Sequence, residues 1–387
     1  MVHSMLDSDQ YKFSMQNAVC KLFPRAIVRY EFIDRNNTIY PNGFAKELRY
    51  IVKYFRDLTC TDEQMSWYEN KCYYFDPVYI NFLKGYKFDP NEVDIFQDDE
   101  GHLYVKIQGY WFRTILWETP LMGTISELYF KMIQPEIKSR EERKENNIKK
   151  GKFFQSNSFP VIEMGTRRRY SYDNHLEVLE DQKGMLLGTS NPHFGHMLDM
   201  NIFGTIAHEF YMFHAATYGF KMANRMASEN WAKVYEGALG IALTDTFTTD
   251  AFYKTFDLKF AKLNDGVRQD SDDPIEHLIK TYNFYKSMRI DPTTKTELFS
   301  DSIKDYETLN KLKNAIKQWP MRDAYGIGTW ETNDVGAKPL NIVIKMTEAY
   351  LQEYKKWIKT IKLSDSASKN LGDSEQIKIC KNELGIN

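Results

Sequence analysis

The most constraining feature of the sequence is a repeated order of short apolar segment, polar turn and helical segment between residues 160 and 334. Each apolar segment has the length of a strand and ends in glycine or small polar residues. This alternation predicts parallel strands joined by helical crossovers, in either a barrel or a doubly wound sheet. The strand-like segments are VIEMGT, MLLGTS, GALGIALTD, KLNDGVRQD, KTELFSD and DAYGIGT.

The first third of the chain has a different pattern. Residues 26–36 and 102–118 alternate apolar and polar side chains at the strand period, whereas residues 46–58 and 77–86 have helical patterns. Residues 1–115 therefore predict a small α+β domain.

Two later segments also have recognisable patterns. Residues 202–226 predict one long helix, and the polar tail from about residue 363 is expected to be peripheral.

Charge and cysteine content exclude several classes of protein. Fifty-one basic against 53 acidic residues argue against a nucleic-acid-binding protein, which normally needs a basic excess. The four cysteines show no CxxC spacing, so neither a zinc site nor a disulfide framework is expected. We find no signal-peptide pattern and no run of 18 apolar residues. The sequence thus predicts a cytoplasmic protein without a membrane partner.

Small donors, arginines and aspartates recur in the turns that follow the strand-like segments. Such turns carry the functional groups of parallel α/β folds. Hydroxyls and backbone N–H groups bind phosphate, arginines neutralise it, and aspartates accept sugar hydroxyls. We therefore expect a phosphate- and ribose-binding surface, built mainly from residues 265–332. The turns are 165–169, 188–191, 244–246, 268–271, 300–302 and 326–329.

His208 is predicted at the start of a helix, in GTIAHEF. A buried structural histidine is the simplest interpretation of this position. A metalloprotease motif is excluded, because HExxH would need a second histidine where Met212 stands.

The ordered set of motifs resembles the nicotinate phosphoribosyltransferase family over about residues 5–350. The motifs are LDSDQYKFSMQ, TRRRYS, LLGTSN, GTIAHEFYMFH, ALTDTFTTDAF, KLNDGVRQDS, KTELFSDS and YGIGTWETND. The resemblance implies an irregular TIM-like α/β barrel at 116–349 after an N-terminal α+β domain at 1–115, which part of 350–387 would join. It implies an ATP-dependent, ligase-type enzyme of NAD salvage, which makes nicotinate mononucleotide and pyrophosphate from nicotinate and 5-phosphoribosyl-1-pyrophosphate. It also implies Mg²⁺ and a homodimer with shared active sites.

The resemblance assigns roles to individual residues. His208 matches the histidine that ATP phosphorylates, Glu209 and Asp245 would orient its ring, and Asp270 would contact the ribose. Tyr11 would stack on the pyridine ring from the partner subunit. The other expected substrate contacts are Arg167 at the pyrophosphate, Ser190 and Thr205 near the nicotinate carboxylate, Arg268 at the ring, and Ser300, Asp301, Gly328 and Thr329 at the ribose and 5′-phosphate. No metal ligand is assigned.

Two residues depart from the family pattern, and one bears on substrate choice. Met164 stands where phenylalanine is usual, and Asp272 where glycine is usual. Ser190 replaces an aspartate of nicotinamide-using relatives, which favours the acid substrate. The alternatives are a nicotinamide or quinolinate phosphoribosyltransferase, or a sugar-phosphate barrel isomerase or aldolase.

Overall fold

The computed structural model describes residues 1–386, which form two compact units. The first unit comprises residues 1–20, 28–204 and 327–345, and the second comprises 21–27, 205–326 and 346–387. The units interleave along the chain, so the domain boundary expected at residue 115 stays a prediction.

The first unit combines an antiparallel sheet with helices and a short parallel strand pair. Strand β2 (Val93–Gln97) pairs antiparallel with β3 (Leu103–Tyr110), and β4 (Val161–Glu163) pairs parallel with β5 (Gly188–Thr189). In β3 the side chains alternate between buried and exposed from Leu103 to Gln108, as its sequence predicts. Its other main elements are α1 (Gln10–Leu22), β1 (Ile27–Asp34), α2 (Phe44–Lys53), α3 (Asp62–Lys71), α4 (Pro77–Gly85), α6 (Glu118–Ile133), α7 (Arg140–Ser156), α8 (Tyr172–Asp181), α9 (Pro192–Leu198) and α16 (Thr329–Thr332).

The strand expected over residues 102–118 ends at Tyr110. Residues 111–117 form a short helix, α5 (Trp111–Thr114), and a 3-10 turn (Ile115–Trp117). Trp111 and the three residues of that turn are fully buried, so the strict in–out alternation of a half-buried strand is lost there. The prediction of a continuous strand was therefore wrong over its second half.

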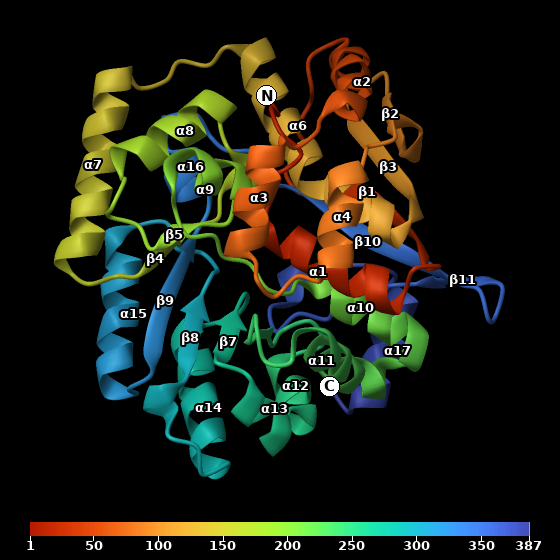
Figure 1. Ribbon diagram of the computed structural model, residues 1–387, viewed down its shortest axis with the longest axis vertical. Coiled ribbons are helices and arrows are strands. Elements are labelled where there is room, and N and C mark those ends of the chain that lie inside the picture. The colour runs from red at the N-terminus through yellow and green to blue at the C-terminus, as the bar shows by residue number, and fades with distance from the viewer. Residues whose placement is uncertain (387) are drawn as a thin grey trace. The chain divides into compact units, whose positions relative to one another are not determined.

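The second unit contains a parallel sheet in the order β6, β7, β8, β9, which confirms the α/β fold class. Figure 1 shows β8 and β9 side by side, with α15 alongside them. The strands are β6 (Ile241–Leu243), β7 (Gly266–Gln269), β8 (Thr296–Phe299) and β9 (Arg322–Ile327). The helices are α10 (His208–Tyr218), α11 (Phe220–Tyr235), α12 (Thr249–Thr255), α13 (Leu258–Leu263), α14 (Pro274–Ser287), α15 (Tyr306–Gln318) and α17 (Ser374–Leu384). An antiparallel pair, β10 (Ile342–Leu351) with β11 (Lys356–Lys359), precedes α17.

The single helix expected over residues 202–226 is two helices. Helix α10 begins at His208 and ends at Tyr218, and α11 begins at Phe220. Gly219, between them, has φ 79° and ψ 162°, a conformation that glycine adopts at little cost and other residues avoid. This break was missed because both helices carry enough apolar residues to read as one pattern.

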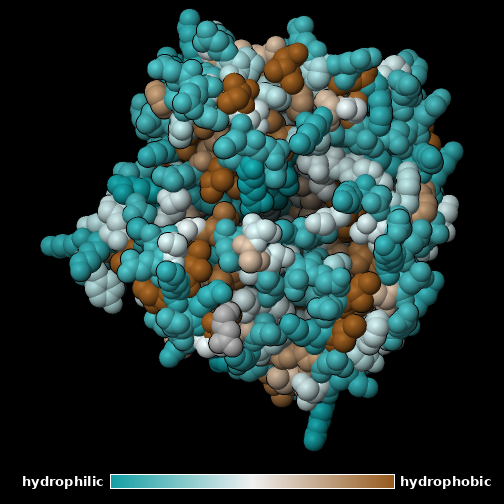
Figure 2. All heavy atoms as spheres, turned by 180° about the vertical axis from the view of Figure 1, so that it is seen from behind, coloured by the Kyte–Doolittle hydropathy of each residue, from teal (hydrophilic) through white to brown (hydrophobic). Residues whose placement is uncertain are grey.

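Hydrophilic side chains cover most of the face shown in Figure 2, and the apolar side chains between them are dispersed. Among residues 1–386, none of the helices is both long enough and apolar enough to span a bilayer.

The close contact between β7 and β8 yields a stability prediction. A Cβ added to Gly266 would lie 2.0 Å from the backbone oxygen of Thr296, which cannot move without breaking the sheet. Gly266→Ala should therefore lower the free energy of unfolding by more than about 2 kcal/mol, the scale of overpacking in a core.

Gly85→Ala is the matched control, because a Cβ there would meet nothing within 4 Å. Urea unfolding of both variants measures the effect. Equal stability of the two variants would contradict the assigned packing of β7 against β8.

Candidate active site

The imidazole of His208, at the first turn of α10, is the centre of a buried polar cluster. Its Nδ1 lies 2.9 Å from Thr246 Oγ1, and its Nε2 lies 2.8 Å from Asp270 Oδ2. The Nζ of Lys362 is 3.0 Å from the same Nε2. Both ring nitrogens are therefore held by neighbouring side chains, which fixes the orientation of the ring.

The two carboxylates of the cluster follow neighbouring parallel strands. Asp245 comes two residues after β6, and Asp270 comes directly after β7. Carboxyl ends of parallel strands meet at one edge of a sheet, as the sequence pattern predicted. Asp245 Oδ1 is 3.9 Å from His208 Nε2, whereas its Oδ2 accepts a hydrogen bond from Ser271 at 2.6 Å.

We expected Asp245 to orient the imidazole and Asp270 to contact the ribose, but the contacts of the two residues differ from this expectation. Asp270, expected at the ribose, is the carboxylate in direct contact with the imidazole, and Asp245 reaches it mainly through Lys362 at 3.1 Å. Glu209 is buried in the first turn of α10. Its expected role in orienting the ring stays a prediction.

Burial and charge together keep the histidine neutral. Burial, with the Lys362 ammonium adding to it, lowers the pKa of His208 to about 4. Burial alone would raise the pKa of Asp270, but Arg268 and His208 hold it well below its usual range. At neutral pH the cluster therefore holds ionised carboxylates beside an uncharged imidazole.

His208, Asp245 and Asp270 also form a group with the composition of a metal site. One ligand atom from each lies within 4.8 Å of the others. However, the Lys362 ammonium contacts both His208 and Asp245 and already supplies the positive charge that the group needs. We therefore do not assign a metal ion to these three residues.

Lys362 belongs to residues 360–371, which we call the C-terminal strap. Ile361 and Leu363, on either side of Lys362, are buried, and Leu363 forms an isolated parallel β-bridge with Phe247. Further along the strap, Ser366 Oγ accepts from the Asp272 N–H, and Lys369 donates to the Asp270 carbonyl. The expectation that the tail is peripheral from about residue 363 was wrong for the strap. Its alternating apolar pattern around Lys362 was the signal that could have identified it.

The expected ribose and phosphate residues of the second unit lie beside this cluster. Ser300 Oγ donates to Asp270 Oδ1 at 3.2 Å, and Asp301 pairs with Lys369 at 2.5 Å. Arg268 donates to the Ile206 carbonyl, and Thr205 donates to the Ile241 carbonyl. The structure therefore brings Asp270, Ser300 and Asp301 together.

Asp272 follows this group in the left-handed backbone region. Its φ is 65°, a conformation that glycine adopts freely and aspartate tolerates better than most residues. Its N–H donates to Ser366, and its carbonyl accepts from Gln269. This backbone conformation explains why glycine is the usual residue of the pattern that the sequence resembles.

The first unit holds the remaining expected substrate residues. The Arg167 guanidinium lies 5.7 Å from the centre of the Tyr11 ring, and its Nε lies 3.3 Å from Asp9 Oδ2. Ser190 Oγ donates to Asp9 Oδ1 at 2.8 Å. Tyr11, Arg167 and Ser190 are thus linked around Asp9, a residue to which the sequence analysis gave no role.

The three consecutive arginines have different environments. Arg169 is buried and makes two hydrogen bonds of 2.8 Å to Asp7, which anchors the N-terminal segment. Arg168 reaches Asn341 at 3.4 Å. Arg167 is 32% exposed and pairs with Asp9 and Glu118.

Gly328 and Thr329 lie in a tightly packed turn at the start of α16. A Cβ on Gly165 would lie 2.7 Å from the Gly328 carbonyl and 2.2 Å from Thr332 Oγ1. The Met164 N–H donates to Ile327, and this fixes the chain just before that turn. The GTRRR and GIGT turns of the sequence are therefore neighbours within the first unit.

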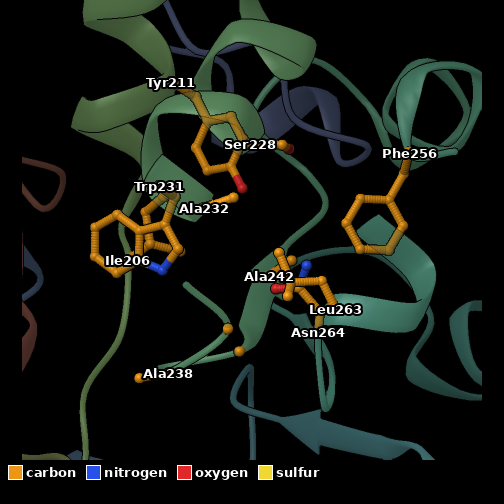
Figure 3. A pocket seen from close by; sticks show the side chains of 12 residues that line it. Ile206, Tyr211, Ser228, Trp231, Ala232, Ala238, Ala242, Phe256, Leu263 and Asn264 are labelled. Carbon is orange, nitrogen blue, oxygen red and sulfur yellow. The ribbon is translucent and has the colours of Figure 1, made fainter. Parts of the chain in front are cut away.

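A separate small cavity in the second unit is lined mostly by apolar side chains. Figure 3 shows Ile206 and Trp231 on one side and Phe256 and Leu263 on the other, with the Tyr211 hydroxyl between them. None of its lining side chains carries a charge at neutral pH. This cavity therefore offers no charged group to a substrate.

Comparison with known proteins identifies the family of the chain. Residues 159–387 match the model of the nicotinate phosphoribosyltransferase family, and residues 6–126 match its N-terminal domain. The chain belongs to the nicotinate phosphoribosyltransferase family.

Individual relatives agree with this assignment over the full length. A nicotinate phosphoribosyltransferase of Desulforapulum autotrophicum is 44% identical over 98% of both chains, and one of Chromohalobacter salexigens is 45% identical over 100% of this chain and 99% of the relative. The crystal structure of the Porphyromonas gingivalis enzyme has a TM-score of 0.96 at 38% identity, covering both chains completely. The family resemblance expected from the sequence motifs is thus confirmed.

Asp272 gives a test of backbone strain in this nicotinate phosphoribosyltransferase family member. Asp272→Gly should change the free energy of unfolding by less than about 1 kcal/mol, because relief of strain offsets the greater freedom of the unfolded chain. Asp272→Val should lower it by about 1–3 kcal/mol, since a β-branched residue is strained in this region. Chemical denaturation measures both, and a valine variant as stable as the wild type would contradict the assigned conformation.

Proposed function

We propose that the chain transfers the phosphoribosyl group of 5-phosphoribosyl-1-pyrophosphate to the ring nitrogen of nicotinate. The products are nicotinate mononucleotide and pyrophosphate, in the salvage route to NAD, and ATP drives the reaction by phosphorylating His208. The observation that carries the proposal is the buried, neutral His208 held against the ionised Asp270, in a chain of this family.

The contacts of His208 indicate which ring nitrogen reacts with ATP. An ionised Asp270 can only accept a hydrogen bond, so the ring proton lies on Nε2. Nδ1 then carries the lone pair and accepts from the Thr246 hydroxyl. A lone pair on Nδ1 can attack the γ-phosphorus of ATP, while the bond to the bridging oxygen breaks and ADP leaves with the electron pair.

The glycosyl transfer itself needs charge neutralisation more than acid–base catalysis. As pyrophosphate leaves, positive charge develops on the ribosyl carbon, and an ionised carboxylate near the ribose stabilises it. Asp270 has the charge for this role, and Ser300 Oγ and Asp301 lie beside it. The pyridine nitrogen already carries a lone pair, so no general base is required.

Further substrate contacts follow from the resemblance. We assign the ribose and 5′-phosphate to Ser300, Asp301, Gly328 and Thr329, and the pyridine ring to Arg268. Arg167 is assigned to pyrophosphate, and its partial exposure supports this role. Tyr11 is assigned to ring stacking in a homodimer.

The choice between nicotinate and nicotinamide involves Asp9 as well as Ser190. The Ser190 hydroxyl already donates to Asp9, and burial raises the pKa of Asp9. A substitution Ser190→Asp would place two carboxylates side by side, which costs stability in addition to any change of specificity. We propose that Ser190 and Asp9 act as a pair near the nicotinate carboxylate, together with Thr205.

Magnesium fits this proposal as an ion that binds together with the phosphates of the substrates. Mg²⁺ prefers oxygen ligands and retains water, whereas the His208 group offers a nitrogen and an ammonium neighbour. We therefore propose that Mg²⁺ enters with the phosphates of the substrates, whose charge it neutralises. We also infer a cytoplasmic location, because all four cysteines are free.

The substrate and the role of ATP can be tested together. Purified protein would be supplied with 5-phosphoribosyl-1-pyrophosphate and either nicotinate, nicotinamide or quinolinate, with and without ATP. We expect turnover of nicotinate, stimulated at least about tenfold by ATP, which corresponds to roughly 1.4 kcal/mol of barrier. His208→Asn should keep the slow reaction and lose the stimulation.

His214→Asn is the matched control, because His214 is a buried histidine of the same helix that bonds to the Phe210 carbonyl and to Asn230. This variant should retain the response to ATP. A preference for nicotinamide or quinolinate, or indifference of the wild type to ATP, would overturn the proposal.

A further inference from the structure

Nε2 of His208 has two close neighbours of opposite charge. Asp270 Oδ2 lies 2.8 Å away and Lys362 Nζ lies 3.0 Å away. The carboxylate bonds to Nε2 only when this nitrogen carries a proton, and the ammonium bonds to it only when it does not. The two contacts therefore serve two different protonation states of the ring.

The position of Lys362 is fixed from several sides. Its Nζ lies 3.1 Å from Asp245 Oδ2, which in turn accepts from Ser271 and Ser364. The residues of the strap that flank Lys362, from Thr360 to Ser364, are buried. The ion pair with Asp245 therefore holds the Lys362 side chain beside the imidazole.

Four other charged side chains lie on the elements around the His208 ring. Asp245 faces it from the end of β6, Arg268 and Asp270 come from β7 and its end, and Glu209 is the next residue on its own helix. Lys362 is the cationic group that contacts the ring nitrogen itself. Its charge therefore opposes a positive charge on the imidazole more directly than Arg268 does.

We propose that Lys362 is a positioning residue that prolongs the lifetime of phosphorylated His208 by holding Nε2 in its unprotonated state. The inference rests on the proposed phosphorylation of His208 by ATP. Before phosphorylation Nε2–H donates to Asp270, and afterwards Nε2 accepts from Lys362.

Phosphorylation of His208 and hydrolysis of the phosphohistidine place different demands on Nε2. When Nδ1 bonds to phosphorus, the ring gains a positive charge, and the proton on Nε2 passes through Asp270 to solvent. The ammonium of Lys362 then donates to the lone pair left on Nε2. Hydrolysis needs water to attack phosphorus while the electron pair of the P–N bond returns to Nδ1. That step is fast only when Nε2 is protonated again, because neutral imidazole is a far better leaving group than its anion.

The test uses the full-length protein and ATP labelled in the γ-phosphate. Lys362→Met should shorten the half-life of the phosphohistidine, after removal of ATP, by about tenfold, the change in protonated fraction that one pKa unit produces. It should also raise the number of ATP molecules hydrolysed for each nicotinate mononucleotide formed. Lys362→Arg retains the charge and should have a half-life closer to that of the wild type.

Lys295→Met is the matched control, because Lys295 is a buried lysine of the same unit that bonds to the carbonyls of Lys262 and Asn264. It should leave the half-life unchanged. If Lys362→Met does not fold, the double variant Lys362→Met/Asp245→Asn leaves one fewer unpaired carboxylate and should have the same short half-life.

The outcomes separate the two proposals. A wild type that acquires no phosphohistidine overturns the proposed ATP coupling, and the inference with it. A labelled wild type whose half-life is unchanged by Lys362→Met overturns the inference alone. An equally shortened half-life in Lys295→Met would also overturn it, because a loss of stability would then explain the effect.

Discussion

The contact of the Lys362 ammonium with His208 and Asp245 is the interaction on which the rest of the proposed chemistry depends. Asp245 is buried beside the imidazole and the partly exposed Asp270 contacts it directly, and an unpaired buried carboxylate is costly enough to shift its own pKa or unfold the site. Burial, with the Lys362 ammonium adding to it, lowers the pKa of His208 to about 4. Against the opposing effect of burial, His208 and Lys362 lower the pKa of Asp245, and Arg268 and His208 hold the pKa of Asp270 well below its usual range. The histidine is thereby neutral and oriented before any substrate binds.

This arrangement ties residues that are distant in sequence to one centre. The strap contributes Lys362 to the ring and Ser364 to Asp245, while Lys369 pairs with Asp301. Asp301 is a residue that we assign to the ribose and phosphate. The strap is therefore part of the functional centre that we propose.

Residues whose positions follow from local patterns could be placed from the sequence. Strand ends place Asp245 and Asp270 at one edge of the sheet, because parallel strands align their carboxyl ends. Asp272 was recognised as a departure, and its positive φ gives the physical reason.

Features that depend on tertiary packing were not predicted. The contact of Lys362 with His208 joins residues 154 positions apart, and the hydrogen bond between Ser190 and Asp9 joins residues 181 positions apart. No periodicity encodes such pairs. The break at Gly219 and the helical turn after Tyr110 were missed because apolar side chains continue on both sides of each.

The central claim is that Asp270 holds the proton on Nε2 and leaves Nδ1 of His208 to react. Phosphorus NMR of protein labelled with ¹⁵N-histidine and treated with ATP reports which nitrogen is bonded to phosphorus. We predict a single phosphohistidine with the phosphoryl group on Nδ1 of His208. A phosphoryl group on Nε2, or on another residue, would contradict this account.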